Sequence, residues 1–176
     1  MDVSRALMIK SQYLRLILSG EKTAELRRTP LKSVGWVAVA ALGGRGGSPR
    51  CIVAVVHFSG CEKVELDALL GRAPEHRVDE ADVRAYLQTR AGFLWTISEV
   101  RLLSIPVEIP HVKGQVNFAK LDAVTVNTVS ANVESAPTEQ RLLEVDAYLA
   151  TLGSEGLPRT SKKRKLEEVA AASAAP

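Results

Sequence analysis

The chain has 176 residues, 46% of them hydrophobic, with 23 Lys and Arg against 20 Asp and Glu. This length and apolar content suit one domain with a single core, followed by a tail. No apolar run is long enough to cross a bilayer, so we expect no membrane partner. The two cysteines and three histidines lack metal-ligand spacing, so we expect no metal and no cofactor.

The net charge of +3 is small, and the positive excess lies in the first 125 residues. A mildly basic folded part permits a nucleic-acid backbone as ligand but does not require one.

The first predicted elements are a short amphipathic helix over 11–19 and a strand over 23–28. Ser11 is a suitable N-cap for the helix, and Gly20 can adopt the left-handed turn that ends it. The composition after the helix then changes to the alternating pattern of a half-buried strand.

Three charged residues follow that helix within one turn and one strand. In the predicted strand Glu25 and Arg27 share one face while Leu26 takes the other, and Lys22 lies at the turn before them. Charges of both signs held this close can position a polar ligand and shift one another's proton affinity. The alternative is an ordinary surface ion pair, which contributes little.

The middle of the chain alternates short strands and helices, which predicts an α+β fold. Pattern alone does not fix how the strands are arranged. The predicted elements are strands over 37–42 and 51–58, helices over 64–70 and 79–87, a strand over 92–103, an extended loop over 105–111 and a closing strand over 116–121.

The composition shifts after residue 123, where we place the end of the domain 1–123. Residues 124–135 are rich in Val, Thr, Asn and Ser without a clear pattern and are interpreted as a linker. Residues 136–153 are predicted to form an amphipathic helix, because Leu142, Val145, Leu149 and Leu152 make one stripe. This stripe can dock on its own domain or bind a protein partner.

Residues 154–176 are predicted to be a disordered basic tail. It contains the cluster Lys162, Lys163, Arg164 and Lys165, which is typical of a nuclear import signal or a phosphate-binding patch. A solvated charge run is the alternative. The import interpretation favours a nuclear over a cytoplasmic location.

Over about residues 5 to 123, the chain resembles the ASCH domain, a member of the PUA-like superfamily. The resemblance rests on Gly20-x-Lys22-x-x-Glu25-x-Arg27, followed by Trp95-Thr96-Ile97-Ser98-Glu99-Val100-Arg101, Pro110-His111 and Gly114-Gln115-Val116-Asn117-Phe118. It implies a small PUA-like β-barrel with helical insertions and a cleft beside the first helix. It also implies that RNA or a modified nucleobase is the ligand.

In such a cleft Lys22 and Arg27 would pair with a phosphate or a base carbonyl, and Glu25 would accept a hydrogen bond from an amine or a sugar hydroxyl. A base also needs a flat stacking partner, for which Trp95, Phe118 and Trp36 are candidates. The alternative for each ring is core packing.

One branch of small ASCH proteins is known as amidohydrolases acting on N4-acetylcytidine, with a lysine, a threonine three positions later and a distant glutamate. Here Lys22 matches the lysine, Glu25 stands at the threonine position, and Glu75 is the candidate for the distant glutamate. The hydroxyl nucleophile of that mechanism is missing, although a carboxylate can activate water as a general base. We therefore predict a nucleic-acid-binding module, in the first place for RNA, with amidohydrolysis of a modified nucleoside as the alternative.

Overall fold

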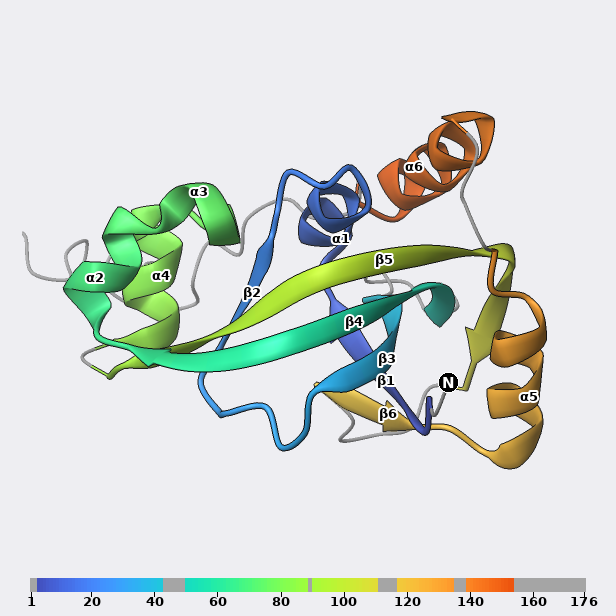
Figure 1. Ribbon diagram of the computed structural model, residues 1–176. Coiled ribbons are helices and arrows are strands. Elements are labelled where there is room, and N and C mark those ends of the chain that lie inside the picture. The colour runs from blue at the N-terminus through green and yellow to red at the C-terminus, as the bar shows by residue number, and fades with distance from the viewer. Residues whose placement is uncertain (1–2, 43–49, 89, 111–116, 135–138, 154–176) are drawn as a thin grey trace, which may run out of the picture.

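The computed structural model describes residues 3–42, 50–88, 90–110, 117–134 and 139–153 (Figure 1). The basic cluster predicted as an import signal, the rest of the tail 154–176 and residues 136–138 of the predicted last helix lie outside the described residues.

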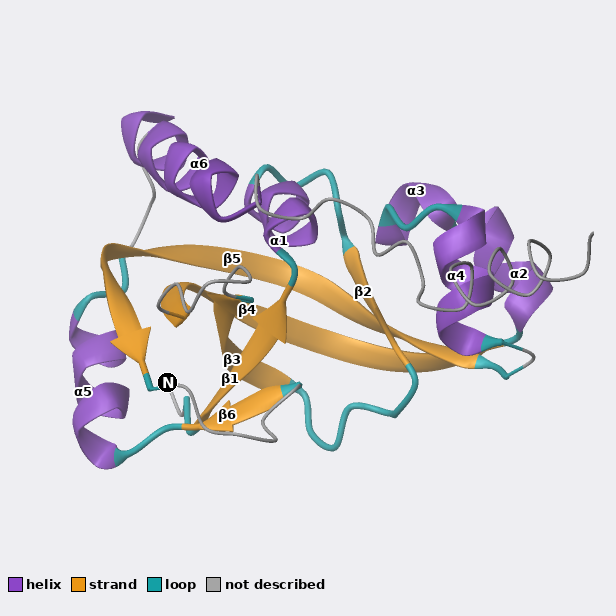
Figure 2. Cartoon of the chain, turned by 180° about the vertical axis from the view of Figure 1, so that it is seen from behind, coloured by secondary structure: helices purple, strands orange, loops and turns teal. Residues whose placement is uncertain are grey.

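A mixed sheet forms the centre of the molecule and curls into a half-barrel (Figures 1 and 2). The strand order is β2-β5-β4-β3-β1-β6, and among the strand pairs of the described residues only β1–β3 is parallel. The strands are β1 (Arg5–Ile9), β2 (Ala24–Arg27), β3 (Gly35–Ala41), β4 (Arg50–Val64), β5 (Gly92–Ile109) and β6 (Phe118–Lys120). The predicted α+β class, a small barrel with helical insertions, is confirmed.

The helices cover the ends and one face of this sheet. Figure 1 shows α2, α3 and α4 gathered at one end of the long β4–β5 ribbon, α5 at the other end, and α1 and α6 side by side above the sheet. The helices are α1 (Ser11–Leu18), α2 (Leu66–Gly71), α3 (Ala73–His76), α4 (Glu80–Leu87), α5 (Ala123–Ala131) and α6 (Glu139–Gly153). Among the described residues, no helix combines the length and the apolar content that crossing a membrane requires.

Helix α1 begins and ends nearly where the sequence predicts. Gly20 has a φ of +78°, which confirms the left-handed turn after the helix. Ser11 is not the cap: it is the first helical residue and is buried, and Lys10 occupies the N-cap position without a side-chain hydrogen bond.

Strand β5 continues beyond its predicted end, through the segment expected to be a loop. Residues 107–109 pair with the start of β4, and Pro106 falls where the register between the two strands shifts. A proline has no N–H to donate, so it is tolerated at such an irregularity and not inside a regular ladder. The predicted loop over 105–111 was therefore wrong for residues 105–109.

The predicted linker over 124–135 was also wrong in conformation, because residues 123–131 form α5. Asp122 caps this helix by accepting a hydrogen bond from the Thr125 amide at 2.8 Å. Val129 is fully buried in the core cluster beneath α5. Tertiary burial thus outweighs the low helix propensity of the Val- and Thr-rich sequence.

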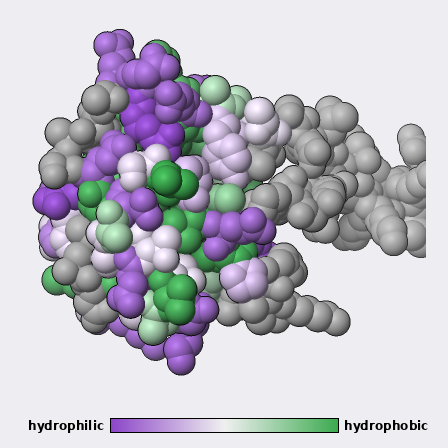
Figure 3. All heavy atoms as spheres, turned by 90° about the vertical axis from the view of Figure 1, so that its right-hand side faces the viewer, coloured by the Kyte–Doolittle hydropathy of each residue, from purple (hydrophilic) through white to green (hydrophobic). Residues whose placement is uncertain are grey.

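The apolar stripe of helix α6 packs on the protein's own core, beside α1. Val145 and Leu149 are buried in the same cluster as the underside of α1, and Asp146 accepts hydrogen bonds from Arg15, one of them at 2.7 Å. Hydrophobic and hydrophilic residues are interspersed on the end of the molecule where α5 and α6 lie (Figure 3). A protein partner for this helix stays a prediction, and it would have to use another face, where Leu143 is exposed.

Replacing Leu149 by Ala should lower the free energy of unfolding by about 2–5 kcal/mol, because a fully buried leucine is lost from the core. Urea denaturation of the full chain measures this. The matched control is Leu143→Ala on the same helix, which should change the stability by no more than about 0.5 kcal/mol. Equal effects of the two substitutions would show that α6 is not docked.

Candidate functional site

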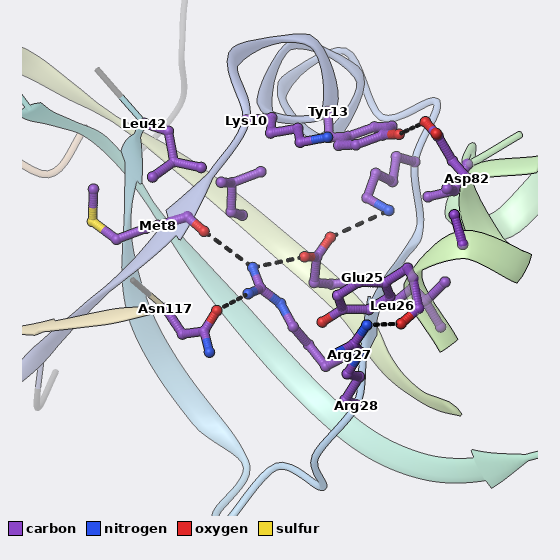
Figure 4. A pocket seen from close by; sticks show the side chains of 15 residues that line it. Met8, Lys10, Tyr13, Glu25, Leu26, Arg27, Arg28, Leu42, Asp82 and Asn117 are labelled. Carbon is purple, nitrogen blue, oxygen red and sulfur yellow. Dashed lines mark hydrogen bonds and ion pairs between the residues drawn. The ribbon is translucent and has the colours of Figure 1, made fainter. Parts of the chain in front are cut away.

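A cavity of about 440 Å³ lies beside α1, near the edges of the half-barrel (Figure 4). Its walls come from the end of β1, the start of α1, β2, α4 and the residue before β6. The lining residues are Met8, Ile9, Lys10, Tyr13, Lys22, Glu25, Leu26, Arg27, Arg28, Leu42, Val78, Asp82, Ala85, Tyr86 and Asn117. The cleft that the sequence predicts beside the first helix is therefore present.

The three charged residues singled out in the sequence form one buried network in this cavity (Figure 4). One carboxylate oxygen of Glu25 lies 3.2 Å from the Lys22 ammonium nitrogen, and the other lies 2.8 Å from a guanidinium nitrogen of Arg27. The exposed fractions of the side chains are 1% for Lys22, 8% for Glu25 and 11% for Arg27. The alternative of an ordinary surface ion pair is excluded by this burial.

Local sequence explains why these side chains point the same way. After the Gly20 turn, the Lys22 amide donates to the Leu16 carbonyl at 2.8 Å, which folds the turn back against α1. In β2, Ala24 and Leu26 are buried in a cluster with residues of α2 and α4. Because strand side chains alternate, this packing directs Glu25 and Arg27 to the opposite face.

Arg27 connects the two edges of the half-barrel. It lies on the edge strand β2, and its guanidinium donates to the Met8 carbonyl of β1 at 3.1 Å and to the Asn117 side chain before β6 at 3.4 Å. The guanidinium carbon also lies 5.9 Å from the ring centre of Trp95. Within the described structure its Nε is buried without a hydrogen-bond partner, so one donor of the network is unused.

Lys22 is held from both sides. Its ammonium donates to the His76 carbonyl of α3 at 2.5 Å and lies 5.4 Å from the ring centre of Tyr13. Burial lowers the pKa of Lys22 below the ordinary lysine value, and the nearby Glu25 carboxylate opposes this shift only in part. The cavity therefore contains a lysine that gives up its proton more readily than a surface lysine.

The rim of the cavity combines two tyrosine rings with two further cations. The Tyr13 hydroxyl donates to Asp82 of α4 at 3.4 Å, and burial followed by the Asp82 charge raises the pKa of Tyr13. Tyr86 of α4 is partly exposed, and the Arg28 guanidinium lies 4.5 Å from its ring centre. Lys10 lies 5.8 Å from the Tyr13 ring. These rim residues were missed at the sequence level; the available signal was the spacing of Asp82 and Tyr86, which puts both on one face of a helix.

The structure places the other predicted site residues elsewhere. Trp95 is 2% exposed and packs edge-on to Phe58 in the core, so its ring is closed to a ligand. Phe118 is half-buried and stacks on Trp95 with ring centres 6.2 Å apart, outside the cavity lining. For both rings the alternative of core packing is the one observed.

Glu75, the proposed distant glutamate, also lies outside the cavity lining. Its carboxylate pairs with Arg72 at 2.7 Å on the outer side of the α2–α3 turn, and this partner lowers the pKa of Glu75. The backbone carbonyl of Glu75 accepts from the Thr23 amide at 2.9 Å, so its link to β2 is through the main chain. In the part of the chain that the structure describes, no group of three or more His, Cys, Asp or Glu side chains could hold a metal ion.

Crystal structures of other proteins share this architecture. A crystal structure of ASCH from Zymomonas mobilis matches 74% of this chain and 95% of that chain, with a TM-score of 0.60 and 15% sequence identity. This chain has the ASCH fold. Two ZmASCH mutant proteins from Zymomonas mobilis match equally, with TM-scores of 0.60 over 74% of this chain and 96% and 98% of theirs, at 13% and 15% identity. Neither a protein-family model nor a curated protein matches the sequence.

The ASCH fold agrees with the resemblance carried by the Gly-x-Lys-x-x-Glu-x-Arg motif. Three charged positions of that motif, Lys22, Glu25 and Arg27, are the ones that meet in the cavity. At 13–15% identity the likeness extends to the fold alone, and the function depends on the chemistry of the site.

Replacing Glu25 by Gln should lower the free energy of unfolding by about 3–5 kcal/mol, because two buried cations lose the charge that neutralises them. Chemical denaturation of the full chain at neutral pH measures this.

The matched control is Glu21→Gln, which removes an exposed glutamate from the same turn and should change the stability by no more than about 0.5 kcal/mol. A stable Glu25→Gln protein would mean that the network is hydrated and weakly coupled.

Proposed function

We propose that this ASCH-fold protein binds single-stranded nucleic acid, in the first place RNA, by holding one nucleotide or modified base in the cavity beside α1. The observation that carries the proposal is the buried Lys22–Glu25–Arg27 network at the base of a cavity rimmed by two tyrosine rings. A volume of about 440 Å³ lies within the range of small-molecule sites, about 300–1,000 Å³.

The charges of the cavity favour an anionic ligand. Four cationic side chains line it, against two carboxylates: Lys10, Lys22, Arg27 and Arg28 against Glu25 and Asp82. The two exposed cations at the rim are suited to phosphate oxygens, and the buried ones to a base carbonyl. Glu25 offers the lone pairs that an exocyclic amine needs.

The two tyrosine rings supply the flat surfaces on which a base can stack. Tyr86 is 37% exposed, and Tyr13 is half-buried on the facing helix. Unstacked bases of single strands bind to such rings, whereas paired bases in a duplex do not present their faces. This favours a single strand, and the RNA ligands that the ASCH resemblance implies fit the same chemistry.

The location and the protein partner belong to the same proposal. A nuclear site of action is supported by the Lys162–Lys165 cluster alone, and a partner on α6 by its exposed Leu143.

Replacing Arg28 by Ala should weaken the binding of fluorescein-labelled single-stranded RNA about tenfold at low salt and make the affinity less dependent on salt, because a phosphate contact is lost. Fluorescence anisotropy with the full chain measures both.

Tyr86→Ala should cost about 1–3 kcal/mol of binding free energy, and Tyr86→Phe, which keeps the ring, should not.

The control for charge is Lys63→Ala. Lys63 is exposed, pairs with Glu65 at the far end of β4 and lies outside the cavity lining. If Arg28→Ala and Lys63→Ala weaken binding equally, or neither does, the cavity is not the binding site.

The lowered pKa of Lys22 favours a second candidate function, amidohydrolysis of a modified nucleoside such as N4-acetylcytidine. A neutral Lys22 could accept a proton from a water molecule that adds to the acetyl carbonyl, and return it to the leaving N4 amine as the C–N bond breaks. Acetate and cytidine would be the products. Glu25 would hold Lys22 in place. Water would have to be the nucleophile, because the described residues that line the cavity include no serine or threonine.

For this second function, cytidine should be released from N4-acetylcytidine at a rate that rises with pH. Lys22 acts as a base only when neutral, so the rise should level off below the ordinary lysine pKa of 10.5. Lys22→Met should abolish the release while Lys10→Met retains it. Chromatography that finds no cytidine above the blank removes the hydrolase and leaves the binding function.

A further inference from the structure

Arg5 and Lys120 form a second concentration of positive charge, at the other end of β1 from the cavity. They are directly opposite each other in the antiparallel β1–β6 ladder, so their side chains share one face with Cβ atoms about 5 Å apart. Within the described part of the chain neither takes part in an ion pair. Like charges in this position destabilise a sheet, and a bound anion would offset the repulsion.

The acid closest to this pair in sequence forms no ion pair with it in the described structure. Asp122 follows Lys120 by two residues, but its carboxylate accepts the Thr125 amide and caps α5. These hydrogen bonds lower the pKa of Asp122, so the carboxylate stays ionised while it caps the helix.

A hollow of about 300 Å³ lies next to Arg5, between β1 and the start of β3. It is lined by Ser4, Arg5, Ser33, Val34, Gly35, Trp36 and Val37, a set without a carboxylate. Two serine hydroxyls and one guanidinium are hydrogen-bond donors suited to the oxygens of a phosphate. The Arg5 guanidinium also lies 5.1 Å from the ring centre of Phe118 on β6, a cation–π contact that restricts its position beside β1.

The hollow and the cavity lie at opposite ends of the same strand, β1. Arg5 and Met8 are three residues apart on β1, which corresponds to about 10 Å of strand, and Lys120 at the end of β6 is likewise three residues from Asn117, which precedes β6. A single strand with one nucleotide in the cavity would bring a neighbouring phosphate to this end of β1. A free mononucleotide has a single phosphate, which cannot lie at the rim cations of the cavity and in this hollow at the same time.

We propose that Arg5, Lys120 and the serine-lined hollow hold a backbone phosphate of the strand whose nucleotide occupies the cavity. This rests on the proposed function and extends it: the ligand is a polynucleotide that runs along β1 towards the start of β3, and the second site contributes affinity without reading the base.

The test uses the full chain, a fluorescein-labelled RNA decamer of mixed sequence, and an equimolar mixture of the four ribonucleoside 5′-monophosphates as competitor. Arg5→Gln and Lys120→Gln should each weaken decamer binding about three- to tenfold at low salt and reduce the slope of log K against log salt by about 0.7. In both variants the affinity for the mononucleotides should equal that of the wild type. It is measured without the RNA, from the changes in NMR chemical shift on titration of protein with mononucleotide.

The control is Lys63→Gln, which removes one charge from an exposed lysine paired with Glu65 at the far end of β4 and should leave decamer binding unchanged. Thermal unfolding checks that each variant is folded, and Lys120, being exposed, is the variant least expected to disturb the fold.

The outcomes separate the two proposals. Wild-type decamer affinity and salt slope in both Arg5→Gln and Lys120→Gln would overturn the second site, and the proposed function would survive if Arg28→Ala still weakened binding. If the decamer binding is insensitive to Arg28→Ala as well, the proposed function fails with it. Equal losses for mononucleotides and decamer in Arg5→Gln would place this arginine in the cavity's own binding and also exclude a separate phosphate site.

Discussion

The Glu25 carboxylate holds together the parts of this molecule from which the cavity is built. It is the one acid between two buried cations, and each of those cations reaches a different element: Lys22 the His76 carbonyl of α3, and Arg27 the Met8 carbonyl of β1. A buried charge without a partner costs several kcal/mol, so the three side chains are stable only as a set. The α2–α4 insertion, β2 and the opposite edge of the sheet are therefore connected through one carboxylate.

The cavity exists because the sheet does not close. β2 and β6 are the edges of the sheet, and an edge strand normally exposes unpaired backbone groups. Here the Met8 carbonyl and the Asn117 side chain meet the Arg27 guanidinium, so a side chain takes over part of what a ladder of backbone hydrogen bonds would do in a closed barrel. One guanidinium bridges a shorter length of the two edges than a ladder of backbone hydrogen bonds would. The space that remains beside it, bordered by α1 and α4, is the cavity.

What the sequence allowed us to predict follows from the range of each interaction. The α1–turn–β2 segment and its charged face were predicted correctly because Gly20, the alternation of β2 and the motif lie within a few residues of one another. Tyr13 and Asp82 could not be paired in advance, since they are 69 positions apart and meet only across the cavity that the folded chain forms between α1 and α4. Trp95 was misassigned for a related reason: strand alternation gives its face, but not whether that face of β5 meets solvent or Phe58.

Two of the differences between the predicted and the observed secondary structure have the same origin. Proline at 106 and the Val- and Thr-rich segment after residue 122 are local signals against a strand and a helix, respectively. Both are overruled by partners that the local sequence does not contain, the start of β4 for the end of β5 and the apolar cluster around Val129 for α5. Propensity decides conformation only where tertiary burial leaves the choice open.

The division between buried and exposed charge bears on which function the site is built for. Both oxygens of Glu25 are engaged by cations, which suits a fixed hydrogen-bond acceptor better than a base that must pick up and release a proton. A rigid acceptor and rigid donors at the base of a cavity discriminate between ligands, because a ligand that fails to match them leaves a buried polar group unpaired. The exposed cations at the rim, in contrast, are screened by salt and contribute attraction with little selectivity. A site that separates selectivity from attraction in this way is suited to recognising one unit of a charged polymer, whose other units need only be held.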